Sequence, residues 1–432
     1  MSQYKAYPAY KDSGVEWIGQ VPEHWEVKPI CRVTSVNDDA LSDSTTGSTR
    51  ISYVDISSVG YTEGIKQATE MAFEDAPSRA RRKASTGDVV VSTVRTYLKA
   101  VAAVTDEYAD CIFSTGFAVL RARQLEQSFL KWMILNELLV QAIEAHSEGL
   151  SYPAINASAL VKLKSVIPPP EEQATIAAAL DRETARIDAL IQKKTRFIEL
   201  LKEKRQALIT HAVTKGLNPH VKMKDSDVGW IGKIPEHWEV KPFFSLLTEL
   251  KRKNTGLVET NILSLSYGRV IQKSENRNMG LVPESYETYQ IVEQGEVVFR
   301  FTDLQNDKRS LRSALVQERG IISSAYMAVS LRNIDSNYFS WLMRSYDLCK
   351  VFYGMGGGVR QSLKFEDVRR LQVLVPPKEE QAEIAAHVNR QLAHNDSLVE
   401  KTERSINLLK ERRSAFITAA VTGQIDLRGE PV

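Results

Sequence analysis

The residue types that most often do chemistry in proteins are all present in this chain of 432 residues, but their spacing builds no familiar catalytic site. The sequence has no GxxxxGK[ST] phosphate loop and no GxGxxG fingerprint, and its seven histidines show no HxxxH or HxxEH spacing. The three cysteines, Cys31, Cys111 and Cys349, are too far apart for a thiolate metal site or a disulfide framework. We therefore expect no catalytic residue, no metal ion and no cofactor in this chain.

One short motif keeps an enzyme open as an alternative. Glu26 and Lys28 match the ExK half of a magnesium-dependent nuclease site, in which carboxylates hold Mg²⁺ and the lysine assists the attacking water. The motif recurs at 239–241, and its acidic partner would be Asp12 or Asp225. A stand-alone Mg²⁺-dependent DNA endonuclease is thus a second hypothesis, which predicts cleavage by the purified chain.

Basic residues with aromatic neighbours form local clusters that are typical of nucleic-acid binding. The whole chain is nearly neutral, with 56 basic and 54 acidic residues, so only local surfaces can attract DNA. Lysine and arginine neutralise phosphates, while Arg and Gln can read base edges through paired hydrogen bonds. The alternative is that acids nearby balance these charges. The candidate DNA-binding residues are Arg79, Arg81, Arg82, Lys83, Arg95, Tyr97, Lys99, Lys251, Arg252, Lys253, Tyr267, Arg269, Arg300, Lys308, Arg309, Arg312, Arg360 and Gln361.

The elements that must position these residues come from a tandem duplication, because long stretches of the sequence occur twice. KDSGVEWIGQVPEHWEVKP at 11–29 returns 213 residues later as KDSDVGWIGKIPEHWEVKP. IPPPEEQATIAAAL, which contains Gln173, returns 208 residues later as VPPKEEQAEIAAHV, which contains Gln381. The same step of 208 residues relates LLKEKRQALITHAVT to LLKERRSAFITAAVT. Two similar frames therefore hold two inserts.

The inserts themselves differ strongly, apart from echoes such as GDVVVS at Gly87 and GEVVFR at Gly295. Short β-branched runs bounded by Gly, Asp and Ser predict strands, and helices are expected near 129–145 and 338–352. A frame that is kept while its contents change suggests one task performed on two targets. The alternative is ordinary drift of surfaces after duplication. The predicted strands lie in RISYVDISSVG, GDVVVSTV, IFSTGFAVLRA, NILSLSYG, GEVVFRF and SSAYMAVSLR.

A long helix is predicted after each proline pair. Proline at the start and glutamates in the first turn favour a helix beginning, and neither proline nor glycine interrupts 171–215 or 379–422. The first segment would be roughly 65 Å long at about 1.5 Å per residue. Its apolar stripe is expected to follow steps of four and three residues, the spacing of a coiled-coil seam. That stripe runs through Ile176, Leu180, Glu183, Ile187, Leu190, Lys194, Phe197, Leu201, Lys204 and Leu208.

We predict a mixed α/β fold of the α+β kind. Two pseudo-symmetric globular domains, residues 1–165 and 223–373, would be joined by two long antiparallel coiled-coil-like helices in the segments 166–222 and 374–432. The alternative is that each helix packs on its own domain as a core element. The sequence shows no signal peptide and no apolar run long enough to span a bilayer, so we expect a cytoplasmic protein.

The doubled WIG(Q/K)(V/I)PEHWEVKP segment and the doubled PPxEEQxxIA helix, which ends in LLKE(K/R)R and AVT, resemble the specificity subunits of type I restriction-modification systems. The resemblance covers the whole chain. It implies a non-enzymatic subunit in which two target-recognition domains each read half of a bipartite DNA site, while the helices fix the distance between the halves. A third hypothesis is a helical scaffold that binds DNA without sequence preference.

The resemblance also implies partners. They would be two adenine methylase subunits, which use S-adenosylmethionine, and two ATP-driven translocating nucleases, which use Mg²⁺ and ATP. The methylases would dock on the helical frame. The residues expected in the helical spacer and at this docking surface are Gln173, Ile176, Leu180, Ile187, Leu190, Leu201, Gln381, Ile384, Val388, Leu398 and Leu409.

Overall fold

The computed structural model describes residues 4–273, 285–304, 311–355 and 362–429. The chain forms two compact units. Unit 1 consists of residues 1–194 and 404–432, and unit 2 consists of residues 195–403. Each unit therefore contains one insert together with part of both long helices.

The two predicted long helices are present at the expected positions. Helix α4 spans Pro170–Lys215 and helix α8 spans Lys378–Val421. Each begins directly after its proline pair with glutamates in the first turn, where carboxylates favour the positive end of the helix dipole. Among the described residues, no helix is long and apolar enough to cross a membrane.

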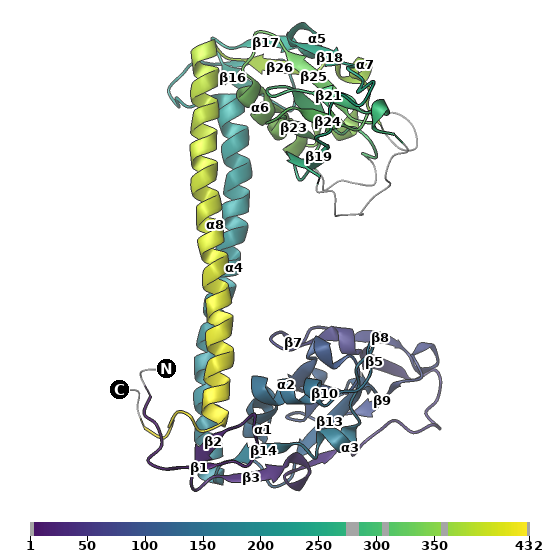
Figure 1. Ribbon diagram of the computed structural model, residues 1–432, viewed down its shortest axis with the longest axis vertical. Coiled ribbons are helices and arrows are strands. Elements are labelled where there is room, and N and C mark those ends of the chain that lie inside the picture. Colours follow the sequence, from purple (N-terminus) through teal and green to yellow (C-terminus); the bar gives the residue numbers. More distant parts are fainter. Residues whose placement is uncertain (1–3, 274–284, 305–310, 356–361, 430–432) are drawn as a thin grey trace. The chain divides into compact units, whose positions relative to one another are not determined.

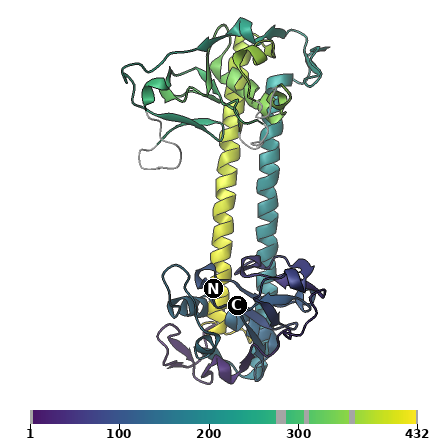
Figure 2. The same ribbon diagram turned by 90° about the vertical axis from the view of Figure 1, so that its right-hand side faces the viewer.

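In each unit a part of α4 lies beside a part of α8, and the two run in opposite directions (Figures 1 and 2). In unit 1 the Arg413 Nε donates to Asp188 Oδ1 over 3.0 Å, while Arg428, beyond the end of α8, lies 3.6 Å from Glu172 at the start of α4. In unit 2 Arg205 of α4 pairs with Asp396 of α8. The antiparallel pairing is thus confirmed within each unit.

The apolar stripe of α4 differs from the predicted one over its middle. Thr184 and Ile198 are buried, whereas Leu190 is 41% exposed and Phe197 is also exposed. The prediction used steps that follow a heptad, but a helix with 3.6 residues per turn needs an additional step of four to keep one face inward. Between Leu180 and Ile187, and again after Ile187, the buried positions therefore lie one residue later in the sequence than predicted.

Unit 1 is built on two four-stranded sheets, ordered β11-β10-β13-β4 and β8-β5-β12-β9. The pair β12–β5 is parallel, and the other pairs are antiparallel. Its elements are β1 (Tyr10–Asp12), β2 (Gln20–Pro22), β3 (Glu26–Pro29), β4 (Thr34–Val36), β5 (Arg50–Val54), β6 (Val59–Gly60), β7 (Gly64–Ile65), β8 (Thr69–Ala72), β9 (Ala80–Lys83), β10 (Val89–Ser92), β11 (Val101–Ala103), β12 (Ile112–Ser114), β13 (Phe117–Ala122), α1 (Gln127–Ile134), α2 (Glu137–Ala145), α3 (Ala157–Leu160) and β14 (Lys164–Ile167).

Unit 2 has one four-stranded antiparallel sheet, ordered β18-β25-β22-β23, with smaller two-stranded pairs. Its elements are β15 (Met223–Asp225), β16 (Lys233–Pro235), β17 (Glu239–Pro242), α5 (Phe243–Leu246), β18 (Leu247–Leu250), β19 (Leu263–Ser266), β20 (Arg269–Gln272), β21 (Gln290–Val292), β22 (Val297–Phe299), β23 (Ser313–Leu315), β24 (Gly320–Ile322), β25 (Met327–Leu331), α6 (Ser336–Leu348), α7 (Phe365–Val368) and β26 (Gln372–Val375).

All six predicted strand segments contain strands, but the first predicted helix is split in two. Helix α1 ends at Ile134, and Asn136 begins α2, because its side chain accepts a hydrogen bond from Leu138 N over 3.1 Å and so caps the second helix. The other predicted helix begins at Ser336 and ends earlier than expected, before Lys350, whose φ of 59° is left-handed.

The main core of each unit joins the sheet to the long helices. In unit 1, α1 lies between the sheet and the helices, and in unit 2 α6 has this position (Figure 1). The unit 1 core contains Ile176 and Leu180 of α4 together with Ile417 of α8. The unit 2 core contains Ile384 of α8 together with Ile209 of α4. Each insert is therefore closed by helix segments from both copies of the repeat.

Candidate nucleic-acid interface

The start of each long helix is fixed to its own unit by a buried glutamine. The Gln173 side chain accepts a hydrogen bond from Glu126 N over 2.8 Å and donates one to Pro168 O over 2.7 Å. Gln381 makes the equivalent bonds to Asp335 N and Pro376 O, both over 2.7 Å. Because both side chains are buried, their prediction as methylase-docking residues is wrong: they satisfy backbone groups that would otherwise be orphaned.

In each unit the repeated PEHWE segment contacts the first turn of the long helix that follows it in the sequence. We call this contact the frame corner of the unit. In unit 1 the carboxylate of Glu172 contacts His24 Nε2 over 2.6 Å and accepts hydrogen bonds from Trp25 Nε1 and Tyr7 Oη, each over 3.0 Å. Burial and the carboxylate raise the pKa of Tyr7, which keeps its hydroxyl protonated as a donor. In unit 2 Glu380 contacts His237 Nε2 over 2.7 Å. His24 and His237 thus connect the PEHWE segments to the starts of the long helices.

Most of the other residues predicted at the docking surface are also internal. Ile176, Leu180, Ile384 and Val388 belong to the cores of their units, so they cannot contact a partner. Ile187 and Leu201 are buried, Leu398 and Leu409 are half-buried, and Leu190 alone of these predicted residues is exposed. Ile176, Leu180, Ile384 and Val388 pack against the protein's own inserts, so apolar residues at helical spacing do not by themselves mark a docking surface. The assignment of all these residues to the helical spacer stays a prediction.

Two loops of unit 1 form one surface. The β10–β11 loop contains the 3₁₀ helix Thr96–Leu98, and the α2–α3 loop covers residues 146–156. Ile155 N donates to Thr93 O over 2.9 Å, and the Thr96 hydroxyl donates to Ser147 Oγ over 2.8 Å. These hydrogen bonds hold the two loops together, although about 50 residues of chain separate them. We call this surface the loop pair of unit 1.

The loop pair of unit 1 carries three of the predicted DNA-binding residues. Arg95 and Tyr97 are exposed, whereas Lys99 binds Glu137 Oε1 over 2.8 Å and so supports α2. Arg95 and Lys99 have left-handed φ values of 52° and 47°, which cost energy in residues other than glycine. The contacts that hold this loop therefore outweigh its backbone strain. The Arg95 guanidinium lies 5.1 Å from the ring centre of Tyr152 in the second loop.

Unit 2 pairs the equivalent loops in the same way. Leu363 N donates to Phe301 O over 3.0 Å, and these residues follow Ile155 and Thr93 by 208 residues. Lys308, Arg309, Arg360 and Gln361, which the sequence predicts to bind DNA, fall outside the described residues.

Arg312, in contrast, is buried within unit 2. Its backbone N–H donates to Asp347, its Nη1 donates to Thr302 O over 3.0 Å, and its guanidinium lies 5.5 Å from the ring centre of Tyr353. Burial raises the pKa of Asp347, since the charged carboxylate loses solvation there. Arg312 is therefore part of the interior and is a correction to the predicted surface.

The basic run on β9 is held by neighbours in its own sheet. Arg79 Nε donates to Tyr53 Oη over 3.3 Å and its Nη2 lies 3.4 Å from Asp55, and both contacts raise the pKa of Arg79. The Arg81 guanidinium lies 4.7 Å from the ring centre of Phe73. These arginines strengthen the β8-β5-β12-β9 sheet, and Arg82 is only half-exposed.

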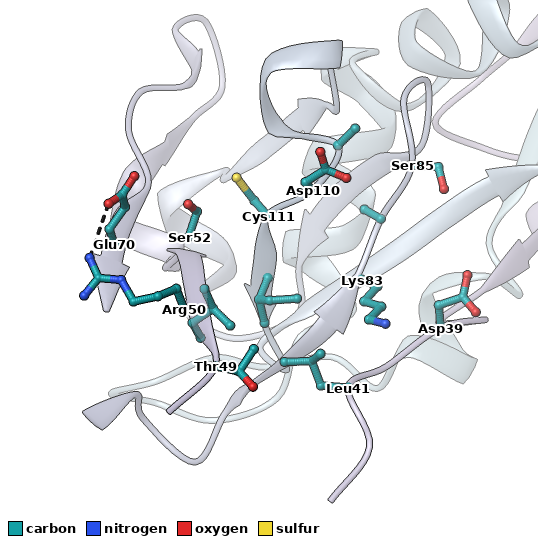
Figure 3. A pocket seen from close by; sticks show the side chains of 14 residues that line it. Asp39, Leu41, Thr49, Arg50, Ser52, Glu70, Lys83, Ser85, Asp110 and Cys111 are labelled. Carbon is teal, nitrogen blue, oxygen red and sulfur yellow. Dashed lines mark hydrogen bonds and ion pairs between the residues drawn. The ribbon is translucent and has the colours of Figure 1, made fainter. Parts of the chain in front are cut away.

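Lys83 lies in a cavity of about 650 Å³ on this sheet (Figure 3). Arg50 also lines the cavity, and its Nη2 is 3.4 Å from Glu70. Asp39 and Asp110 are further acids in the lining. Three carboxylates outnumber the two cations, so this cavity does not favour a phosphate.

Unit 2 has a more basic groove of about 520 Å³ between the β19–β20 hairpin, α6 and the two long helices. Arg205, Arg269 and Arg344 line it, and Asp396 is the one carboxylate among the described residues of its lining. Arg344 Nη2 donates to Ser313 O over 3.1 Å and also binds Gly268 O at the hairpin turn. Burial lowers the pKa of Arg344 to about 10, so it is still charged at neutral pH. The groove therefore favours an anion.

Other predicted basic residues of unit 2 vary in their freedom to bind DNA. Arg252 pairs with Glu296 and Glu293, and Lys251 binds Glu249 over 2.9 Å. Lys253 is exposed, and Arg300 is half-exposed. Tyr267 is highly exposed at the hairpin turn next to Arg269.

Several residues of these surfaces could not be predicted from the sequence. Arg205 lies inside the repeated LLKEKR segment, and Arg344 lies in a helix that shows no basic cluster. Leu150 and Tyr152 are exposed in the loop pair of unit 1, where the sequence reads as an ordinary polar turn. An exposed apolar residue can be recognised only once its neighbours are known.

The nuclease motif forms no metal site in this arrangement. Lys28 binds Glu26 within strand β3, and Lys241 binds Glu239 in the same way within β17. Asp12 accepts a hydrogen bond from Gly14 N over 2.8 Å in the turn that follows β1. Over the part of the chain that the structure describes, no three His, Cys, Asp or Glu side chains are placed to hold a metal ion.

Known proteins are similar to this chain in sequence and in fold. No family model matches the chain. It is 24% identical, over 95% of its length and 96% of the other protein, to a Methanocaldococcus jannaschii protein assigned as the type I restriction enzyme MjaX specificity subunit. It is 22% identical to the type I restriction enzyme EcoKI specificity subunit of Escherichia coli, over 94% of this chain and 90% of that one.

Two solved structures have a similar fold. One is a chain from a study of complex assembly and conformational transition of the type I R-M system, with a TM-score of 0.71 and 18% identity over 94% of this chain and 99% of that chain. The other is the HsdS subunit of Thermoanaerobacter tengcongensis, with a TM-score of 0.53 and 20% identity over 94% and 98% of the two chains.

Proposed function

We infer that this chain belongs to the family of type I restriction enzyme specificity subunits, and that it selects the DNA sequence on which the other subunits of the complex act. Its similarity to these relatives extends over nearly the whole of both proteins. The chain is the non-catalytic member of such a complex, and methylation and cleavage belong to partner chains.

We further propose that each unit reads one half of a bipartite site. The observation that carries this proposal is the contrast between matching glutamine contacts in the frame and different loops. Gln173 and Gln381 make the same pair of hydrogen bonds, whereas the loops that follow β10 and β22 have unrelated sequences. A constant frame with variable loops suits two domains that recognise different DNA sequences.

The proposed DNA contacts differ between the units. In unit 1 Arg95 and Tyr97 of the loop pair would face DNA, with the arginine on phosphate or a base edge. In unit 2 Arg205, Arg269 and Arg344 line the basic groove, which suits the phosphate backbone. Lys308, Arg309, Arg360 and Gln361 stay predictions from the sequence.

The partners are proposed to be two methylase subunits and two restriction subunits, acting with this chain on DNA in the cytoplasm. S-adenosylmethionine, Mg²⁺ and ATP would be used by those subunits. Leu200 in unit 2 and Leu408 in unit 1 are equivalent residues of the repeated LLKE(K/R)R segment, and both are exposed. This equivalent pair of exposed leucines gives two similar docking positions, which fits two copies of one methylase.

The test is to map modified bases in DNA from a host that expresses this chain with its methylase partner. We expect methylated adenines in one interrupted sequence, and their loss in a host that lacks only this chain. Exchange of the insert at residues 30–165 for that of another specificity subunit should change one half of the sequence and keep the other. If both halves change, the assignment of one unit to each half is wrong. If the methylation pattern does not depend on this chain, the proposed function is wrong.

A further inference from the structure

The loop pair of unit 1 exposes an unusual amount of apolar surface. Leu150 is 105% exposed, as much as in an isolated extended peptide, and Tyr152 beside it is 65% exposed. Val94, Tyr97 and Leu98 of the other loop are also exposed. Exposed apolar side chains that lie together in one patch, unlike single scattered ones, often mark a binding surface.

This apolar tip is held in a defined conformation. Glu148 N donates to Ala154 O over 2.8 Å, and Ala154 N donates to Glu148 O over 2.9 Å, so the backbone closes a tight turn around Leu150. Gly149 has a φ of 107°, and a Cβ there would lie 3.2 Å from Tyr152 O. The turn thus presents Leu150 without the entropy cost of ordering a free loop on binding.

The contrast between the units indicates what the tip binds. A methylase that docks twice on the same chain needs similar residues in both units, and the repeated frame supplies them. The tip sequence EGLSYPAIN has no counterpart in GGGVRQSLK of unit 2, 208 residues later. The ligand of the tip is therefore one that differs between the two units, and the two DNA half-sites are such ligands.

The chemistry of the tip fits an unstacked base step. Proteins that kink DNA insert leucine and similar apolar side chains between base pairs, and aromatic rings stack on exposed bases. Arg95, which lies over the Tyr152 ring, adds a positive charge for a neighbouring phosphate.

We propose that Leu150, supported by Tyr152, inserts between base pairs of the half-site that unit 1 reads, so that this half-site is selected partly by how easily it unstacks. The inference rests on the proposed function. It goes beyond it by naming the residue that deforms DNA and by limiting this role to unit 1. Pyrimidine–purine steps unstack most easily and are the expected place of insertion.

The test uses the full chain in complex with its methylase partner and duplexes that carry the sequence found by methylation mapping. A mismatch is placed at each base pair of the unit 1 half-site in turn, and the dissociation constants of matched and mismatched duplexes are compared. A mismatch removes part of the unstacking cost, so at the insertion step the wild-type complex should bind about tenfold more tightly.

Leu150→Ala and Tyr152→Ala should abolish this gain and weaken binding to the matched duplex by about tenfold. Val258→Ala, which removes an exposed apolar side chain in unit 2, is the matched control and should keep the gain. Because Leu150 is fully exposed, the melting temperature of its variant should equal that of the wild type.

The outcomes separate two failures. If a mismatch raises the affinity of the wild-type complex at no step, the insertion by Leu150 is wrong while the proposed function stands. The same holds if the rise in affinity survives in both variants, since it then comes from another subunit. If no methylated sequence depends on this chain, the proposed function fails and the insertion fails with it.

Discussion

The repeated frame is alike in the two units, whereas the loop pairs differ. In the frame, Asp188 pairs with Arg413 in unit 1, and the residues 208 positions away, Asp396 and Arg205, pair in unit 2. In the described part of the loops, the backbone hydrogen bond from Ile155 N to Thr93 O has its counterpart in the bond from Leu363 N to Phe301 O. The frame thus fixes where each loop pair lies within its unit and leaves its side chains free to vary.

The frame corners also differ in one respect. In unit 1 the carboxylate of Glu172 accepts from both Trp25 and Tyr7, whereas the buried indole N–H of Trp238 in unit 2 has no hydrogen-bond partner among the residues that the structure describes. A buried donor without a partner carries a free-energy cost. The corner of unit 1 is therefore expected to be the stronger of the two, which can be tested.

The largest expected effect comes from breaking the frame. Trp25→Ala or Trp238→Ala removes a fully buried ring and should lower the free energy of unfolding by about 3–5 kcal/mol. Methylation of the whole bipartite site should fall with it, because the loops lose their support. Denaturant unfolding and methylation mapping measure the two effects. A variant that unfolds more easily yet methylates only one half-site would contradict a common frame.

A smaller change sharpens the difference between the corners. Trp25→Phe leaves Glu172 without one of its donors, so it should cost about 1.5–3 kcal/mol from the lost charged hydrogen bond in addition to the change in packing. Trp238→Phe loses only packing and relieves the unpaired N–H. Denaturant unfolding of the two variants gives the comparison. Equal losses would show that the two corners are equally strong.

The loops should show the opposite behaviour to the frame. Arg95→Ala and Tyr97→Ala should weaken binding to the unit 1 half-site by about tenfold each and change the free energy of unfolding by less than about 0.5 kcal/mol. Arg95→Ala should also reduce the salt dependence of binding, since one phosphate contact is lost. The Val258→Ala variant serves as control. A loss of stability without a loss of affinity would place these residues in the frame.

The ion pairs between the long helices should contribute little. Asp188→Ala, Arg413→Ala and the double variant should give a coupling energy of about 0.5–1 kcal/mol, because Asp188 is half-exposed to solvent. The Asp396–Arg205 pair, whose arginine is more exposed, should give less. Thermal unfolding at two salt concentrations measures both. Values above those of exposed pairs would mean that the helices depend on them.

The smallest expected effect is a change in how the stability of unit 1 depends on pH under acidic conditions. Hydrogen bonds from the Arg428 side chain hold the pKa of Asp426 below its ordinary value. This contribution to stability is fully present above the ordinary pKa of an aspartate and is lost as the pH falls through the lowered pKa. Asp426→Asn should therefore destabilise unit 1 at pH 7 and show a flatter acid limb in a pH series of unfolding curves. An unchanged limb would contradict the role of this pair.

The sequence by itself determined the duplication, the frame segments, both long helices and the six strand segments, because these depend on local signals. Proline and glutamate fix a helix start, glycine ends it, and β-branched runs form strands wherever they are buried. The repeated motifs also carry the family resemblance, which implies the recognition of a DNA sequence.

Only the tertiary structure decided which residues face outward. Gln173 and Ile176 look like an amphipathic docking face in the sequence, but the protein's own insert covers them. Arg312 is predicted from the sequence to contact DNA, but it is buried. Leu150 looks like an ordinary loop residue in the sequence, but it is fully exposed. The physical reason is that burial is set by chain segments that are distant in sequence, such as the end of α8 packed in unit 1, and no local pattern encodes them.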